Sequence, residues 1–182
     1  MSTARLEAFS DGVIAVIITI LVLELKVPAR DGWLGLWAVW PMLFLYLLTF
    51  VQVGIYWVNH HYLTDEAETV THGILWSNLV FLFCLSLFPF ATEWVGAKGL
   101  TEFSAALYSV VSLLPGMSYA VLAGQVRETS TVPPRFSKAK QFTSVALYLV
   151  AVAAAYVRPW LALVLLSAVA VMWMVPPRRA EE

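Results

Sequence analysis

Long runs of apolar residues limit the folds open to this chain more than any other feature of its sequence. A helix needs about 20 mostly apolar residues to cross the hydrocarbon core of a bilayer. Six stretches reach or approach that length, at about 5–25, 34–58, 74–94, 103–124, 142–157 and 160–175. Only 13% of the residues are charged, whereas a soluble domain has roughly 25%. We therefore expect residues 1–182 to form a single all-α integral membrane protein with six transmembrane helices.

The connections between these stretches predict how the helices are arranged. Only Arg158 and Pro159 separate the last two, so we expect a tight antiparallel hairpin, with one long kinked helix as the alternative. The longest polar connection, 128–140, divides the helices into four plus two. Of the 11 lysines and arginines, seven fall on the N-terminal side of the membrane in this scheme and four on the other. Lysine and arginine favour the cytoplasmic side, which predicts a multi-pass cell-membrane protein with both termini in the cytoplasm.

A carboxylate lies at the mouth of the first apolar stretch. Asp11 follows Phe9 and Ser10 directly, and a long apolar run begins after it. Hydrocarbon does not solvate a carboxylate, so such a residue usually has a partner and often serves ion movement. Arg5 lies six residues upstream. It can pair with Asp11 or Glu7 or attract lipid headgroups, and the sequence leaves these possibilities open.

The spacing Arg5-x-x-x-Phe9-Ser10-Asp11, at the entrance to a first membrane helix, resembles the transmembrane protein 175 family of endosomal and lysosomal potassium channels and their prokaryotic relatives. The resemblance implies a symmetric homotetramer in which the first helix of each subunit lines the pore. It also implies that rings of large apolar side chains, and not backbone carbonyls, form the narrowest points.

In that family the constrictions lie five, nine and twelve residues after the aspartate, and a threonine commonly lies eight residues after it. Here these positions hold Val16, Ile20 and Leu23, with Thr19 at the eighth. Val16 departs from the isoleucine or leucine usual in the family, so the narrowest ring can shift to Ile20 or Leu23. At about 100° per residue, all four side chains share one helix face. Ordinary contact with lipid or another helix would give the same apolar face.

A second polar cluster ends the second stretch at the depth of Asp11. Trp57 precedes His60 by three residues, which also matches the family pattern. There, polar groups of the second and third helices bind the serine and aspartate and hold the first helix in place. The resemblance therefore assigns a helix-anchoring role to Arg5, Phe9, Ser10, Asp11, Trp57 and His60. For His60, both a static hydrogen bond and a pH-sensitive contact remain open.

These observations favour a potassium-permeable cation channel with a hydrophobic constriction in the first helix. The chain has no Thr-Val-Gly-Tyr-Gly sequence, so a carbonyl filter of that type is excluded. The alternative is a small proton-coupled secondary transporter that uses Asp11. Such transporters usually have helix-breaking residues at mid-membrane, and Pro115-Gly116 is the one candidate.

Other classes of function find little support in the sequence. It lacks Gly-x-Ser-x-Gly, His-Glu-x-x-His and paired intramembrane aspartates, so we expect no enzyme. The spacings of His60, His61 and His72 with the nearby acidic residues match no zinc signature, so we expect no metal. A net charge of −1 gives no strong positive field that would attract nucleic acid, so we expect no nucleic-acid partner. The expected partners are other copies of the chain, the bilayer and monovalent cations, with potassium as the permeant ion and no bound cofactor.

Overall fold

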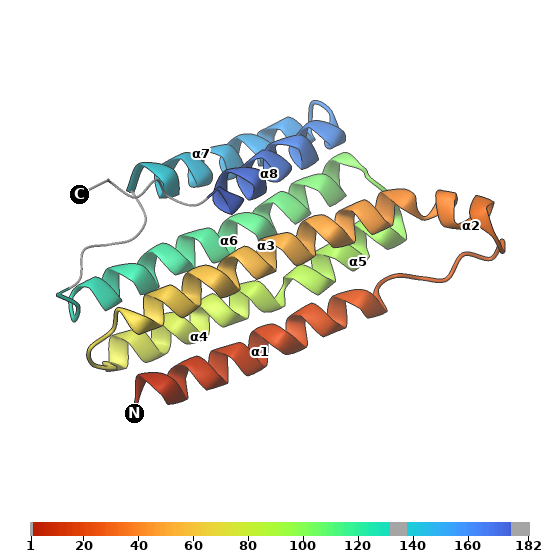
Figure 1. Ribbon diagram of the computed structural model, residues 1–182. Helices are drawn as coiled ribbons and strands as arrows, with labels where there is room; N and C mark the ends of the chain where they lie inside the picture. Colours follow the sequence, from red (N-terminus) through yellow and green to blue (C-terminus); the bar gives the residue numbers. More distant parts are fainter. Residues whose placement is uncertain (1, 132–137, 176–182) are drawn as a thin grey trace.

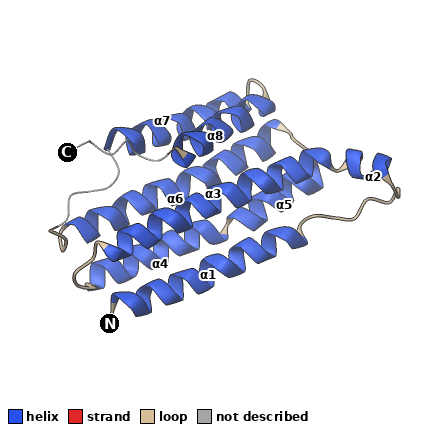
Figure 2. Cartoon of the chain, viewed as in Figure 1, coloured by secondary structure: helices blue, strands red, loops and turns tan. Residues whose placement is uncertain are grey.

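The computed structural model describes residues 2–131 and 138–175, and every regular element in these ranges is a helix. Figures 1 and 2 show the helices lying lengthwise beside one another, with the short α2 beyond the end of the bundle. Their bounds are α1 Thr3–Leu23, α2 Trp33–Ala38, α3 Trp40–Asp65, α4 His72–Ser86, α5 Phe88–Lys98, α6 Glu102–Arg127, α7 Lys138–Ala155 and α8 Pro159–Met174. The expectation of an all-helical protein is confirmed.

The connections alternate between the two ends of the bundle. The turn after α3 and the last turn of α6 lie at the end where α1 begins, and the turns after α1, α5 and α7 lie at the other end (Figure 1). Helix α6 packs against α4, α5, α7 and α8, while α1 packs against α3, α4 and α5. Helix α1 therefore lies at the edge of the subunit, with part of its surface covered by no other described helix.

Four helical segments are long and apolar enough to cross a membrane: Thr3–Leu23, Trp40–Asp65, His72–Lys98 and Glu102–Arg127. Helices α7 and α8 are shorter, with 18 and 16 residues. A helix of that size rises roughly 24–27 Å, slightly less than the ~30 Å hydrocarbon core. The count of six spans therefore stays a prediction for these two helices. Their expected hairpin is present, because α7 packs directly on α8. The alternative of one long kinked helix is wrong.

The third expected span, at about 74–94, proves to be two helices. Helix α4 ends at Ser86 and α5 begins at Phe88, with Pro89 in its first turn. Proline lacks an N–H group, and its ring clashes with the carbonyl four residues earlier, so the helix breaks there. Pro115, by contrast, lies inside a continuous α6. The one feature that favoured a broken helix and hence a transporter does not interrupt its helix.

The second expected span, at about 34–58, lies further along the chain than the hydropathy indicated. Residues 33–38 form the separate helix α2, and α3 begins at Trp40, with Pro41 in its first turn. At its other end α3 continues to Asp65. Asn59 and His60 are buried there, and polar neighbours within the subunit, described below, bind the His60 side chain and the Asn59 carbonyl. The helix therefore extends past the point where hydropathy falls.

Candidate functional site

The two faces of α1 differ in their surroundings. Leu6, Ser10, Ile14, Ile17 and Leu21 recur every three or four residues, and all are buried against the rest of the subunit. The opposite face carries Val16, Thr19, Ile20 and Leu23, which we call the exposed stripe. The exposed fractions of Val16, Ile20 and Leu23 are 55%, 39% and 69%, and Thr19 is also exposed. The structure thus brings the four expected constriction residues together on one uncovered face.

Thr19 contributes the one polar side chain of the exposed stripe. Its hydroxyl donates to the backbone carbonyl of Val16 one turn earlier, at 2.9 Å. The hydroxyl hydrogen therefore points toward the helix backbone, and the lone pairs of the hydroxyl oxygen remain available to coordinate a cation. A ring of such oxygens can replace a small part of an ion's hydration shell.

Asp11 has an indole as its partner. The Trp57 Nε1–H of α3 donates to Asp11 Oδ1 at 2.9 Å. Arg5 forms no ion pair with Asp11 or Glu7 in the described part of the chain, so neither of those two expected pairings is present. A hydrogen bond to a charged acceptor is shorter and stronger than one between neutral groups. The bond therefore ties the start of α1 to α3 without a neutralising cation.

A directed chain of buried hydrogen bonds lies beside this contact. The His60 Nε2 atom is 2.7 Å from Asn78 Oδ1, and Asn78 Nδ2 donates to Ser10 Oγ at 3.0 Å. The Ser10 hydroxyl donates in turn to the Leu6 carbonyl at 2.9 Å. Because Asn78 Oδ1 only accepts, the network assigns the proton of His60 to Nε2. His60 thus contacts the serine and aspartate indirectly, through an asparagine.

We call Ser10, Asp11, Trp57, His60 and Asn78 the polar anchor. His60, Asn78 and Ser10 are at most 1% exposed, and the His60 ring stacks on Phe81 with 5.7 Å between the ring centroids. Buried and mutually bonded groups of this kind fix the rotation of a helix, since turning α1 would leave them without partners. The polar anchor and the exposed stripe lie on opposite sides of α1.

Asn78 is the member of the polar anchor that the sequence analysis missed. The signal was present, because an amide inside an apolar span is costly unless it is hydrogen-bonded. Phe9 occupies the opposite situation. It is 51% exposed, so within one subunit it lies on the uncovered face of α1 and does not belong to the polar anchor.

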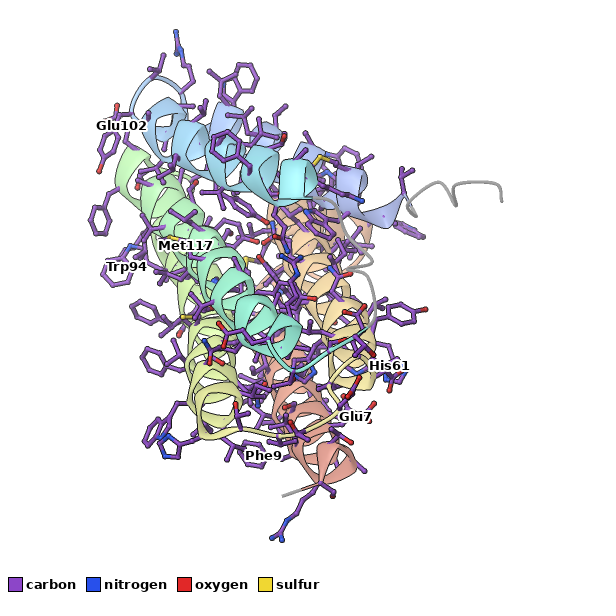
Figure 3. The ribbon with its side chains drawn as sticks, turned by 90° about the vertical axis from the view of Figure 1, so that its left-hand side faces the viewer. Glu7, Phe9, His61, Trp94, Glu102 and Met117 are labelled. Carbon is purple, nitrogen blue, oxygen red and sulfur yellow. The ribbon has the colours of Figure 1, made fainter. Side chains whose placement is uncertain are left out.

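Histidine and carboxylates also meet at the start of α1. The His61 Nδ1 atom bonds Glu7, and its Nε2 atom is 3.7 Å from Asp65. Figure 3 shows Glu7 and His61 together at one end of the bundle. Ligand atoms of these three residues lie within 4.8 Å of one another. His61 nevertheless presents a different nitrogen to each carboxylate, which suits an ion-paired bridge between α1 and α3, and we assign no metal to it.

Replacing Trp57 with phenylalanine is expected to weaken the attachment of α1. The change keeps an aromatic ring and removes the one donor that binds Asp11. The loss should be about 1.5–2 kcal/mol, the lower part of the range for bonds to charged groups, because Trp57 is partly exposed. We expect a lower melting temperature and a lower open probability with an unchanged potassium-to-sodium permeability ratio.

The matched control is Trp76→Phe, since the Trp76 indole donates only to His72 on its own helix. This variant should behave like the wild type. A changed permeability ratio in Trp57→Phe would place Asp11 in the ion path instead of in the polar anchor.

Comparison with known proteins decides the family. A family model for the endosomal/lysosomal potassium channel TMEM175 matches residues 5–89, from the start of α1 into α5. A potassium channel of Chryseobacterium sp. (strain P1-3) is 39% identical over 187 residues, which cover 100% of this chain and 97% of that protein. The chain belongs to the TMEM175 family. The resemblance inferred from the first helix is confirmed, and the family comprises ion channels and not enzymes.

Two further TMEM175 relatives extend the comparison. A potassium channel of Streptomyces collinus (strain DSM 40733 / Tue 365) is 36% identical over 128 residues, or 66% of this chain and 62% of that protein. A crystal structure of a lysosomal potassium-selective channel TMEM175 homolog from Chamaesiphon minutus superposes with a TM-score of 0.80. Its sequence identity is 28%, and the match covers 94% of this chain and 96% of that one. The helical arrangement over 94% of the chain, and not only α1, is therefore shared with that homolog.

Proposed function

We propose that this protein is a potassium-permeable cation channel of the cell membrane, assembled as a homotetramer around four copies of α1. One observation carries the proposal: the exposed stripe is the face of α1 that the subunit leaves uncovered, and it is apolar apart from Thr19. Four such faces around a fourfold axis enclose a path. The choice of potassium as the permeant ion rests on relatives that are named potassium channels.

The conduction mechanism follows from the chemistry of the exposed stripe. Val16, Ile20 and Leu23 form successive hydrophobic rings, and a narrow hydrophobic ring controls current by losing and regaining its water. Thr19 lies between the Val16 and Ile20 levels and offers oxygen to an ion that has lost part of its hydration. Residues 1–182 carry no Thr-Val-Gly-Tyr-Gly filter. Selection among monovalent cations therefore comes from the cost of partial dehydration.

The polar anchor holds the rotation of α1 that keeps the exposed stripe toward the pore axis. It lies at the end of the bundle where α1 begins, which we place in the cytoplasm with both termini. A different rotation of α1 would turn the large side chains of the exposed stripe away from the axis. Asp11 in this scheme is a structural partner of Trp57 and not a ligand for ions.

A proton-coupled transporter using Asp11 is the competing function. It would need Asp11 to be exchanged between two sides of the membrane, usually through broken helices at mid-membrane. Asp11 is instead bonded to Trp57 at one end of the bundle. This bond favours the channel, although the third span is divided between α4 and α5.

Single-channel recording separates the two functions. We expect purified protein in a planar bilayer to give discrete unitary current steps that reverse near the potassium equilibrium potential under a potassium–sodium gradient. Bilayers fused with protein-free vesicles are the control. Saturating flux driven by a proton gradient, with no unitary steps at any voltage, would establish the transporter in place of the channel.

A further inference from the structure

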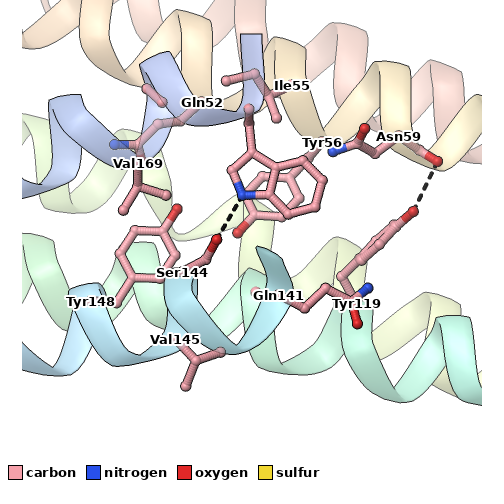
Figure 4. A pocket seen from close by; sticks show the side chains of 13 residues that line it. Gln52, Ile55, Tyr56, Asn59, Tyr119, Gln141, Ser144, Val145, Tyr148 and Val169 are labelled. Atoms are coloured by element: carbon pink, nitrogen blue, oxygen red, sulfur yellow. Dashed lines mark hydrogen bonds between the residues drawn. The ribbon is translucent and has the colours of Figure 1, made fainter. Parts of the chain in front are cut away.

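A partly open cavity lies between helices of the subunit, away from the exposed stripe and the polar anchor. It is bounded by α3, α6, α7 and α8, as Figure 4 shows from close by. The space open to the centre of a water-sized sphere is about 30 Å³. Six of its lining residues matter here: Gln52, Tyr56, Tyr119, Ser144, Tyr148 and Trp173. All belong to one chain, so the cavity exists whatever the assembly.

Gln52 lines this cavity with a carboxamide that has no partner. The residue is 2% exposed, and neither its Oε1 nor its Nε2 atom forms a hydrogen bond in the part of the chain that the structure describes. Burying an amide without hydrogen bonds is unfavourable, and native proteins satisfy the great majority of such groups with protein or with ordered water. The cavity is the space that Gln52 shares with the α7–α8 hairpin.

Two polar pairs around the cavity are already formed. Trp173 Nε1 donates to Ser144 Oγ at 2.7 Å, and the Ser144 hydroxyl donates to the Lys140 carbonyl at 2.8 Å. The Tyr119 hydroxyl donates to the Asn59 carbonyl at 3.0 Å. The first pair lies within the hairpin and the second joins α6 to α3, so neither reaches Gln52.

The remaining polar groups are the side-chain amides of Asn59 and Gln141 and the hydroxyls of Tyr56 and Tyr148, which lie within hydrogen-bonding reach of each other. Tyr56 lies one turn beyond Gln52 on α3, Tyr148 comes from α7, and they are 8% and 4% exposed. Gly116 of α6 makes room for them, because a Cβ at that position would lie 3.2 Å from the Tyr56 hydroxyl and 3.5 Å from the Tyr148 ring. Hydroxyls both donate and accept, so they can share a hydrogen-bonding molecule with the Gln52 carboxamide.

We propose that the cavity holds an ordered water molecule, bound by the Gln52 carboxamide and by the hydroxyls of Tyr56 and Tyr148. A buried water needs two to four polar partners and roughly 10–15 Å³ of such space, and the cavity offers both. The water adds a polar link between α3, which carries Trp57 and His60 of the polar anchor, and the α7–α8 hairpin, beside the contact of Tyr56 with Tyr148.

Radiolytic labelling in ¹⁸O-water tests the proposal on the intact wild-type protein. Hydroxyl radicals formed from a bound water modify buried side chains beside it, and bulk solvent does not reach them. We expect Tyr56 and Tyr148 to take up ¹⁸O several-fold faster than Tyr108. Tyr108 is the internal reference because it is 0% exposed, does not line the cavity and bonds Thr49 at 2.8 Å. Equal rates at the three tyrosines would overturn the proposal.

Gln52→Met, of similar volume and without hydrogen-bonding groups, is expected to bring the labelling of Tyr56 and Tyr148 close to the Tyr108 rate. The matched control is Ser109→Ala, which removes a buried hydroxyl that lies outside the cavity and bonds the Ala105 carbonyl of its own helix, and it should leave the labelling of Tyr56 and Tyr148 unchanged. The melting temperature gives a second readout with a definite sign. Gln52→Met lowers it if a water hydrogen bond is lost, and a rise would mean that the amide was truly unsatisfied and would overturn the proposal.

Discussion

Leu23→Asn is expected to raise the resting potassium current by roughly tenfold, the factor that corresponds to ~1.4 kcal/mol in an activation barrier. Leu23 is 69% exposed within the subunit and ends the exposed stripe. An amide at a hydrophobic ring holds water there, so the ring dewets less readily and conducts more of the time. Ile20→Asn should act in the same direction, one turn deeper. Whole-cell or bilayer current at a fixed amount of surface protein is the measurement.

The matched control for this prediction is Leu149→Asn. Leu149 lies on α7 and is 55% exposed, so the same chemical change falls on an uncovered apolar face far from α1. We expect no additional current from it. Wild-type current and ion preference in both α1 variants would place the pore wall on another helix, and a current increase in Leu149→Asn would show a non-specific leak.

Asn78→Leu is expected to cause the largest loss of stability of the substitutions considered. The side chains are similar in size, but leucine neither accepts the His60 Nε2–H nor donates to Ser10 Oγ. The His60 Nδ1 atom is already buried without a partner in the described part of the chain, so both ring nitrogens would then be unsatisfied. An orphaned buried group costs about 1–3 kcal/mol. The measurement is thermal unfolding of the detergent-solubilised protein.

Two further variants make that prediction specific. Ser112→Ala is the control, because the buried Ser112 hydroxyl bonds only the Tyr108 carbonyl of its own helix, and its loss should be small. In His60→Leu the imidazole is gone, so adding Asn78→Leu should cost less than it does alone. Strict additivity of the two substitutions would mean that the buried chain through His60 does not stabilise the fold.

The sequence alone determined the class of the protein and the position of its first helix. Apolar runs have few alternatives in a bilayer, because every backbone group must be satisfied within the helix. The motif from Arg5 to Asp11 likewise indicated the family from a few consecutive residues. Such a motif depends only on local spacing, so it can be recognised without the rest of the chain. Val16, Thr19, Ile20 and Leu23 were grouped correctly on one face for the same reason, since helix periodicity is local. Their role in a pore stays a prediction.

Only the tertiary structure decided which polar side chains are hydrogen-bonded to one another. The sequence placed His60 near Ser10 and Asp11, but the amide between them comes from Asn78 on a different helix, and no local pattern encodes that contact. The same holds for Asp11, whose partner is the Trp57 indole and not Arg5. The unpaired Gln52 in its cavity emerged only from packing α3 against the α7–α8 hairpin. Hydropathy measures how a segment partitions into the membrane, whereas hydrogen-bond partners depend on the rotation and depth of each helix, which long-range packing sets.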